Sequence, residues 1–177
     1  KQKTAYEILT CDWSSDVCSS DLFQPGDTAS AQAVSTEKYD GVVFEMEHGA
    51  YDIKALRDCL QYMLNRQQIA ASGSVAPAVT PMVRIPPNGA EMNQWVAKQV
   101  LDQGVYGVLW PHISTVEEAR NAVASCRYAR PAGAPRYEPA GQRGDAPGNA
   151  ARFWGISQQE YYDRADVWPL DPKGEIL

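Results

Sequence analysis

Residues 39–49, YDGVVFEMEHG, decide how this chain folds. An apolar run rich in Val and Phe lies between Gly41 and the polar segment at 47–49, which predicts a short buried strand. Two further stretches have the same design, VTPMVRIP at 79–86 and YGVLWPHI at 106–113. A charged or polar side chain ends or follows each predicted strand, so these strand ends are the first place to look for chemistry.

Segments with helical signals alternate with these strands. Asp27 is placed to cap a helix over Thr28–Lys38. Asp52 caps a second helix, whose apolar residues recur at helical spacing as Ile53, Leu56, Leu60 and Met63/Leu64. A third helix is expected over Gln94–Leu101, with Met92, Val96 and Val100 in register and Gly104 at its end. Residues 70–78 are small and predict a loop.

Capping boxes mark two later helices. Ser114 and Glu117 frame the start of one, with an expected apolar face of Val116, Ala119, Val123 and Cys126. Ser157 and Glu160 open a short helix that runs to about Arg164. Between them, residues 127–155 are rich in Pro, Gly, Arg and Ala and predict a long structureless arm with a functional or interface role. Four aromatic residues are expected to serve packing or an interface: Trp154, Tyr161, Tyr162 and Trp168.

The alternation predicts an α/β fold with a parallel sheet and right-handed crossovers. Barrels and doubly wound sheets share this pattern, but no G-x-G-x-x-G follows a strand, which weakens a dinucleotide-binding interpretation. The net charge of −6 and the lack of a basic stripe argue against a nucleic-acid partner, and no apolar run is long enough to predict a membrane span.

The first 22 residues differ in character from the rest. KQKTAYEI and CDWSSDVCSSDL resemble one reading frame of a sequencing primer and its adapter, so we expect residues 1–22 to be an adapter-derived artefact and 23–177 to be the native domain. Two of the four cysteines lie in that stretch. The other two, Cys59 and Cys126, are isolated and suggest reduced thiols and a cytoplasmic location.

The order and framing of three pieces, EMEHG at 45–49, PMVRIP at 81–86 and KQVLDQG at 98–104, resemble the HpcH/HpaI family of metal-dependent aldolases. The resemblance covers most of residues 23–177 and implies part of a (β/α)8 TIM barrel, about strands 2–4 with their helices. Strands 5–8 and the family's metal ligands, a Glu and an Asp, are expected beyond Leu177. It also implies a divalent metal (Mg²⁺, Mn²⁺ or Co²⁺), a small keto acid and an aldehyde as reactants, and a homo-oligomer.

The resemblance also implies site residues. His48 is expected to act through a water as general base, Arg84 to bind the pyruvate oxygen and stabilise the enolate, and Asp102 to orient His48. Each has a simpler interpretation: a backbone-satisfied histidine, a structural ion pair, or a solvated carboxylate. Glu47 is either a support for metal-bound waters or a loop carboxylate.

Two further segments are less typical of the family. At His112 the family usually has an apolar residue, so this imidazole is expected to be structural or to line the pocket. Gln142-Arg143-Gly144 resembles the family's R-G segment within a longer, interrupted stretch. The arginines of this stretch, RYARPAGAPRYEPAGQRG at 127–144, are expected to close over a carboxylate-bearing substrate or to contact a neighbouring subunit.

The resulting hypothesis is a carbon–carbon lyase that cleaves 2-keto-hydroxy acids to pyruvate, or an analogue, and an aldehyde. One alternative is a citrate-lyase-β-like enzyme acting on acyl-CoA thioesters, against which the Glu47-His48 pair argues. The other is an inactive, poorly soluble fragment, because a partial barrel leaves sheet edges uncovered.

Overall fold

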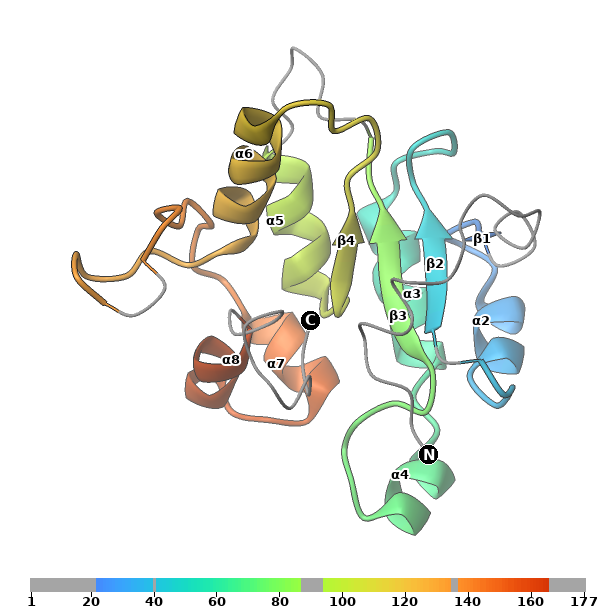
Figure 1. Cartoon of the computed structure of the whole chain (residues 1–177). Helices are drawn as coiled ribbons and strands as arrows, with labels where there is room; N and C mark the ends of the chain where they lie inside the picture. The colour runs from blue at the N-terminus through green and yellow to red at the C-terminus, as the bar shows by residue number, and fades with distance from the viewer. Residues whose placement is uncertain (1–21, 40, 87–93, 135–136, 166–177) are drawn as a thin grey trace.

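A computed structural model describes residues 22–39, 41–86, 94–134 and 137–165. Its centre is a four-stranded parallel sheet in the order β1-β2-β3-β4, formed by Leu22–Phe23, Gly41–Glu45, Thr80–Arg84 and Gly107–Leu109 (Figure 1). All three strand pairs are parallel. The predicted α/β class with a parallel sheet is therefore confirmed, and a first strand at 22–23 precedes the three expected from the sequence.

The described helices connect and cover these strands (Figure 1). They are α2 (Thr28–Val34), α3 (Ile53–Tyr62), α4 (Arg66–Ser72), α5 (Gln94–Gln103), α6 (Val116–Cys126), α7 (Gly148–Trp154) and α8 (Gln158–Arg164).

Strand register aligns the ends that matter for function. Glu45 is the register partner of Arg84, and Arg84 is the register partner of Leu109. Side chains within and just after these three positions therefore gather at one edge of the sheet, which we call the carboxyl edge. The opposite edge is marked by the hydrogen bond from the Tyr106 backbone N–H to the Pro81 carbonyl, 2.9 Å.

Several predicted helix boundaries are confirmed. The Asp52 side chain accepts from the backbone N–H groups of Lys54 and Ala55 at the start of α3. The Ser157–Glu160 capping box opens α8, which ends at Arg164 as predicted. Local capping decides these ends because it satisfies backbone groups that the helix itself leaves unpaired.

Other predicted boundaries were wrong. The first helix ends at Val34, four residues before the expected Lys38. Residues 70–72, expected in a loop, belong to α4, which Asn65 caps through the Gln68 N–H and which ends at left-handed Gly73. The Asn65 cap was the overlooked sequence signal.

The start of α6 is shifted by one residue from the prediction. Thr115 and Glu118, not Ser114 and Glu117, form the capping box. The predicted apolar face was also wrong: Val116 and Val123 are 77% and 42% exposed, whereas the buried positions of this helix are Ala122, Ala124 and Ser125. Small residues are buried here because α6 packs against α5.

The region 127–155 is not structureless, contrary to the prediction. The Gln142 N–H donates to the Ala124 carbonyl and the Arg143 N–H to the Arg127 carbonyl, both at 2.8 Å, and the segment then continues into α7. Two of the four aromatic residues expected to serve packing do so: Trp154 and Tyr161 are buried in the hydrophobic core. Trp168, Met92 and the strand expected near the C-terminus lie outside the described residues.

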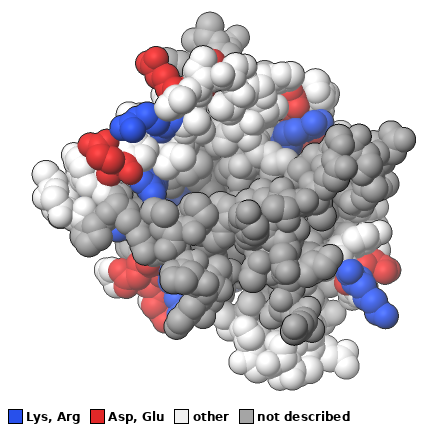
Figure 2. All heavy atoms as spheres, viewed as in Figure 1, with Lys and Arg blue, Asp and Glu red and all other residues white. Residues whose placement is uncertain are grey.

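On the face shown in Figure 2, the described Lys and Arg side chains lie close to Asp and Glu in small groups of mixed sign. Within the described part of the chain, no helix is both long enough and apolar enough to cross a membrane.

Candidate functional site at the carboxyl edge

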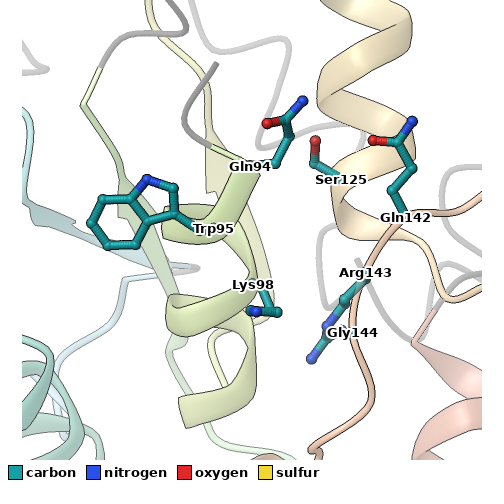
Figure 3. A pocket seen from close by; sticks show the side chains of 7 residues that line it. All are labelled: Gln94, Trp95, Lys98, Ser125, Gln142, Arg143 and Gly144. Atoms are coloured by element: carbon teal, nitrogen blue, oxygen red, sulfur yellow. The ribbon is translucent and has the colours of Figure 1, made fainter. Parts of the chain in front are cut away.

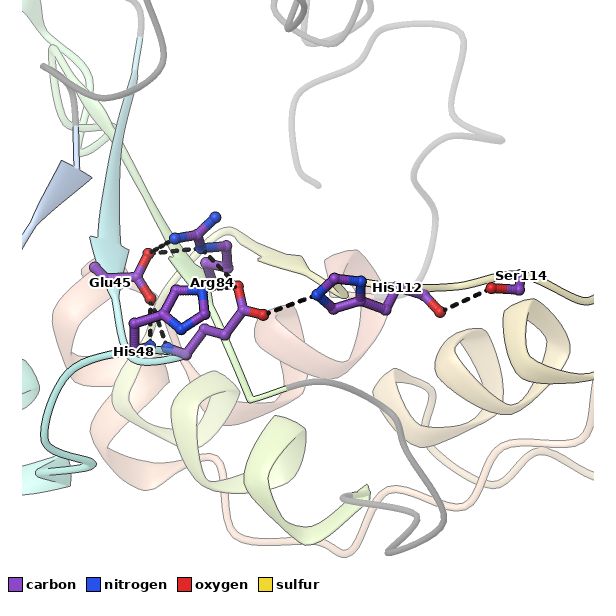
Figure 4. A network of polar contacts seen from close by, with 6 residues as sticks. Glu45, His48, Arg84, His112 and Ser114 are labelled. Carbon is purple, nitrogen blue, oxygen red and sulfur yellow. Dashed lines mark hydrogen bonds and ion pairs between the residues drawn. The ribbon is translucent and has the colours of Figure 1, made fainter.

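Five polar side chains gather at the carboxyl edge, and we call them the edge cluster: Glu45, Glu47, His48, Arg84 and His112 (Figure 4). They come from the end of β2, the end of β3 and the loop after β4. The sequence predicted His48 and Arg84 here, and the structure brings these two residues into one cluster through the carboxylates.

Arg84 lies at the centre of this cluster. Its guanidinium donates from Nε to Glu45 Oε2 at 2.6 Å, pairs with the same carboxylate through Nη2, and lies 3.1 Å from Glu47 Oε2. The Arg84 side chain is still 28% exposed. The structural ion pair therefore exists, and part of the guanidinium remains open to a ligand.

Glu47 links the arginine to both histidines. Its Oε1 lies 3.3 Å from His112 Nε2, and its Oε2 lies 3.5 Å from His48 Nε2. The Glu47 side chain is only 4% exposed, whereas the side chains of His48 and His112 are 73% and 75% exposed. A buried carboxylate thus holds two imidazoles whose rings face the outside.

Glu45 is a member of the edge cluster that the sequence analysis did not single out. Its Oε1 accepts the backbone N–H groups of Glu47 and His48, at 2.6 and 3.0 Å, while Oε2 binds Arg84. Burial acts to raise the pKa of Glu45, but the His48 N–H and the Arg84 guanidinium outweigh it and hold that pKa below its usual value. A carboxylate in the last position of a buried strand was the available signal.

His112 has an unusual backbone conformation. Its φ is +60°, and among the described residues no other non-glycine has a positive φ. The Ser114 hydroxyl donates to the His112 carbonyl at 3.3 Å, and the Ser114 N–H is held by Glu118 of the α6 capping box. The loop after β4 thus turns His112 back toward Glu47, which the sequence analysis did not foresee.

Asp102 does not join the edge cluster. Its Oδ1 accepts from Arg143 Nη2 at 2.8 Å, and it makes no contact with His48 among the described residues. The reason is topological. A helix that links two parallel strands returns to the start of the next strand, so the last turn of α5 lies beside Gly104 and Tyr106 at the opposite edge (Figure 1).

Asp102 and three neighbouring residues form a second group, the buried arginine cluster: Asp102, Tyr128, Arg143 and Tyr161. The Arg143 side chain is 1% exposed, donates to Tyr161 Oη at 3.1 Å, and lies 4.5 Å from the centroid of the Tyr128 ring. This burial contradicts the expectation that Arg143 closes over a substrate or meets a neighbouring subunit.

The two ionic partners respond differently to this environment. Burial raises the pKa of Asp102 and outweighs the guanidinium of Arg143, which acts to lower it. For Arg143, burial acts to lower the pKa, but Tyr161, Tyr128 and Asp102 together raise it. Burial therefore has the larger effect on the pKa of Asp102. For the pKa of Arg143, the surrounding Tyr and Asp side chains together have the larger effect.

A pocket of about 330 Å³ lies away from the edge cluster, between α5, α6 and the segment 142–144. Figure 3 shows Lys98 on α5 and Arg143 on the facing segment. Its lining residues are Gln94, Trp95, Lys98, Ser125, Gln142, Arg143 and Gly144. No member of the edge cluster lines this pocket, so the two sites are separate.

The described residues do not by themselves fit a metal ion. No three His, Cys, Asp or Glu side chains within the described ranges are grouped so that they could hold one. Glu45 and Glu47 are committed to Arg84 and to backbone N–H groups.

Comparison with known proteins gives the chain a family. The family model for HpcH/HpaI aldolase/citrate lyase matches residues 19–138. A hydroxypyruvate/pyruvate aldolase of Roseobacter denitrificans is 30% identical over 125 residues, which is 70% of this chain and 40% of that protein. A 5-keto-4-deoxy-D-glucarate aldolase of Escherichia fergusonii is 32% identical over 133 residues, covering 72% and 43% of the two chains.

Solved structures agree on the fold. An HpcH/HpaI aldolase/citrate lyase family protein from Burkholderia cenocepacia superposes with a TM-score of 0.60 at 24% identity, covering 82% of this chain and 49% of that one. Macrophomate synthase superposes with a TM-score of 0.51 at 25% identity, covering 72% and 36%. The chain spans about two fifths of the length of the two aldolases it resembles. The matched family model shows that the chain belongs to the HpcH/HpaI aldolase/citrate lyase family.

Proposed function

We propose that the full-length protein is a carbon–carbon lyase that cleaves a 2-keto-hydroxy acid to pyruvate, or a close analogue, and an aldehyde. Its relatives carry the names of aldolases of this kind. The observation that carries the proposal is the edge cluster itself. An arginine and two exposed imidazoles lie together at the ends of neighbouring parallel strands, where α/β proteins place their ligands.

Arg84 is the group suited to the negative charge of the reaction. As the carbon–carbon bond breaks, its electron pair moves onto the keto-acid half and forms an enolate. A guanidinium already fixed by Glu45 and Glu47 needs little reorganisation to stabilise that charge. Its planar fork also suits a keto acid, whose oxygens are close together.

His48 is the proposed base for the hydroxyl proton, directly or through a water. Its ring is 73% exposed, and Glu45 fixes its backbone N–H. Glu47 supports the ring from the protein side, as the carboxylate does in a triad. The orienting role of Asp102 stays a prediction that the contacts of this chain do not support, since its carboxylate is bound by Arg143.

Three broader features belong to the same proposal. The four parallel strands form the first part of a (β/α)8 barrel, and the protein assembles as a homo-oligomer. A divalent metal, Mg²⁺, Mn²⁺ or Co²⁺, would be held by residues outside the described ranges and would supply a Lewis acid for the keto acid. The edge cluster holds two carboxylates and one guanidinium, and this excess of negative charge favours a cation beside an anionic substrate.

The test is an assay of pyruvate release by the full-length protein from 2-keto-4-hydroxy acids of increasing length. We expect release in the presence of Mg²⁺, Mn²⁺ or Co²⁺ and its loss after chelation, with recovery when the metal is returned. Acyl-CoA thioesters are assayed in parallel. Cleavage of thioesters alone, without cleavage of hydroxy-keto acids, would replace this proposal with the citrate-lyase-like activity.

A further inference from the structure

The contact between His112 and Glu47 has the geometry of a carboxylate–imidazole pair. Glu47 Oε1 faces His112 Nε2 at 3.3 Å, slightly closer than the 3.5 Å between Glu47 Oε2 and His48 Nε2. The buried carboxylate lies within ion-pair distance of one nitrogen of the His112 ring, and no described residue is hydrogen-bonded to its Nδ1. This arrangement orients an imidazole for proton transfer, as the third group of a triad does.

The backbone conformation of His112 supports the same interpretation. A left-handed conformation is uncommon for a residue with a Cβ and costs free energy, so it persists only where surrounding contacts impose it. Ser114 and the α6 capping box supply those contacts. As a result, the His112 side chain is 75% exposed yet lies against Glu47. Glu47 in turn contacts Arg84, the arginine proposed to bind the enolate.

The reaction requires two proton transfers, one at oxygen and one at carbon. During cleavage the substrate hydroxyl loses its proton, and the enolate carbon must gain one to become the methyl group of pyruvate. His48 is already assigned to the hydroxyl. Among the described residues, His112 is the other imidazole of the chain, and it lies on the β4 side of Arg84 while His48 lies on the β2 side (Figure 4).

We propose that His112 is a second catalytic residue, which delivers and removes the proton at the enolate carbon while Glu47 orients its ring. This inference rests on the proposed lyase function. In the cleavage direction, the hydroxyl proton passes to His48, the carbon–carbon bond breaks, and its electron pair forms the enolate against Arg84. Protonated His112 then gives its proton to the enolate carbon. Proton exchange with water returns His48 and His112 to their starting states, so no proton is gained or lost overall.

The experiment separates the two transfers in the full-length protein. Exchange of the pyruvate methyl protons in D₂O, followed by proton NMR, reports transfer at carbon. Aldehyde release in a single turnover of a hydroxy-keto acid reports transfer at oxygen together with bond cleavage. The variant is His112→Asn, because Asn tolerates the left-handed backbone and so removes the ring without straining the loop. His48→Asn is the matched comparison.

We expect His112→Asn to slow methyl exchange by about 10²–10⁴-fold while first-turnover aldehyde release stays within about threefold of the wild type. His48→Asn should show the reverse. Methyl exchange in His112→Asn within threefold of wild type would overturn the inference, and so would equal loss of both activities. A wild-type protein that neither exchanges nor cleaves would overturn the proposed function itself, which is a distinct result.

Discussion

The molecule has two ionic groups built around an arginine, and they differ in what surrounds the charge. In the edge cluster, Arg84 is 28% exposed and shares its carboxylates with two open imidazoles. In the buried arginine cluster, Arg143 is 1% exposed and lies over the rings of two tyrosines. An exposed arginine held in place can exchange partners with a ligand, whereas a buried one cannot leave its partner without a large desolvation cost. The proposed chemistry therefore belongs to the edge cluster, whereas we expect the buried arginine cluster to stabilise the fold.

The largest expected effect comes from removing the buried arginine. Arg143→Ala leaves the Asp102 carboxylate without its ionic partner and removes the contacts with Tyr128 and Tyr161. We expect a loss of about 3–5 kcal/mol in the free energy of unfolding, measured by denaturant titration. Arg152→Ala is the matched control, because Arg152 is exposed on α7 and should change the value by less than about 0.5 kcal/mol. Equal effects of the two variants would remove the distinction between the clusters.

Asp102→Asn is the variant that separates the two roles considered for this residue. The buried arginine cluster predicts little or no loss in the free energy of unfolding at neutral pH, because burial raises the pKa of Asp102 and the folded state therefore favours a neutral side chain whose oxygen still accepts from Arg143. Turnover per folded molecule should stay close to wild type. Asp58→Asn, at an exposed position of α3, controls for the loss of charge alone. A large fall in turnover with an unchanged melting temperature would instead support the pairing with His48 that the family resemblance implies.

A loss of stability is also expected at the aromatic packing beside the buried arginine cluster. Trp154 Nε1 donates to the Gly104 carbonyl at 2.7 Å, and its ring stacks on Tyr106 at 4.4 Å between centroids. Trp154→Phe keeps an aromatic ring but leaves that carbonyl unpaired, which should cost about 1–3 kcal/mol. Trp95→Phe, at a position that is 52% exposed, should have little effect. Thermal unfolding of the two variants measures the difference.

The contributions of Glu45 and Asp102 to the stability of the fold should change in opposite directions as the pH falls. The pKa of Glu45 is lower in the folded state, so its contribution to stability is present above about pH 4.5 and is lost as the pH falls through the folded-state pKa. The pKa of Asp102 is raised, so the folded state favours its protonated form, and stability from this group is lost as the pH rises through its folded-state pKa.

Melting temperatures measured between pH 3 and pH 7 test this difference. Glu45→Gln should flatten the fall in melting temperature on the acid side. Asp102→Asn should make the fall in melting temperature steeper, because it removes the gain in stability that accompanies protonation of Asp102. Identical pH profiles of the two variants would show that the carboxylates do not differ in this way.

Much of the fold was predictable because it depends on local signals. The strands at 41–45 and 80–84 follow from apolar runs, and Asp52 and Ser157 mark helix starts by capping. Helix α4 was missed because it is short and buries none of its residues. Helix α7 was missed because it is short and follows a stretch rich in Pro and Gly, although Ala150, Ala151, Phe153 and Trp154 are buried in it. The prediction for the buried face of α6 was wrong because close packing on α5 favours small residues over larger apolar ones.

The site was predictable only where it depends on strand ends. His48 and Arg84 follow from their positions at the ends of neighbouring strands. Asp102 lies beside Arg143 because the end of a helix and the end of a strand lie at opposite edges of a parallel sheet, and its expected pairing with His48 stays a prediction. Glu45 was overlooked although it ends a predicted strand. His112 reaches the site through a left-handed backbone and a contact with Glu47, which one-dimensional spacing does not encode.

The most direct test of the central claim compares turnover in wild type and Arg84→Lys of the full-length protein, with Arg57→Lys as an exposed control. Lysine keeps the positive charge beside Glu45 but cannot reproduce the planar fork of arginine. The edge cluster predicts a loss of about 10²–10³-fold in pyruvate release with a melting temperature close to wild type. Unchanged turnover in Arg84→Lys would contradict the assignment of chemistry to the edge cluster.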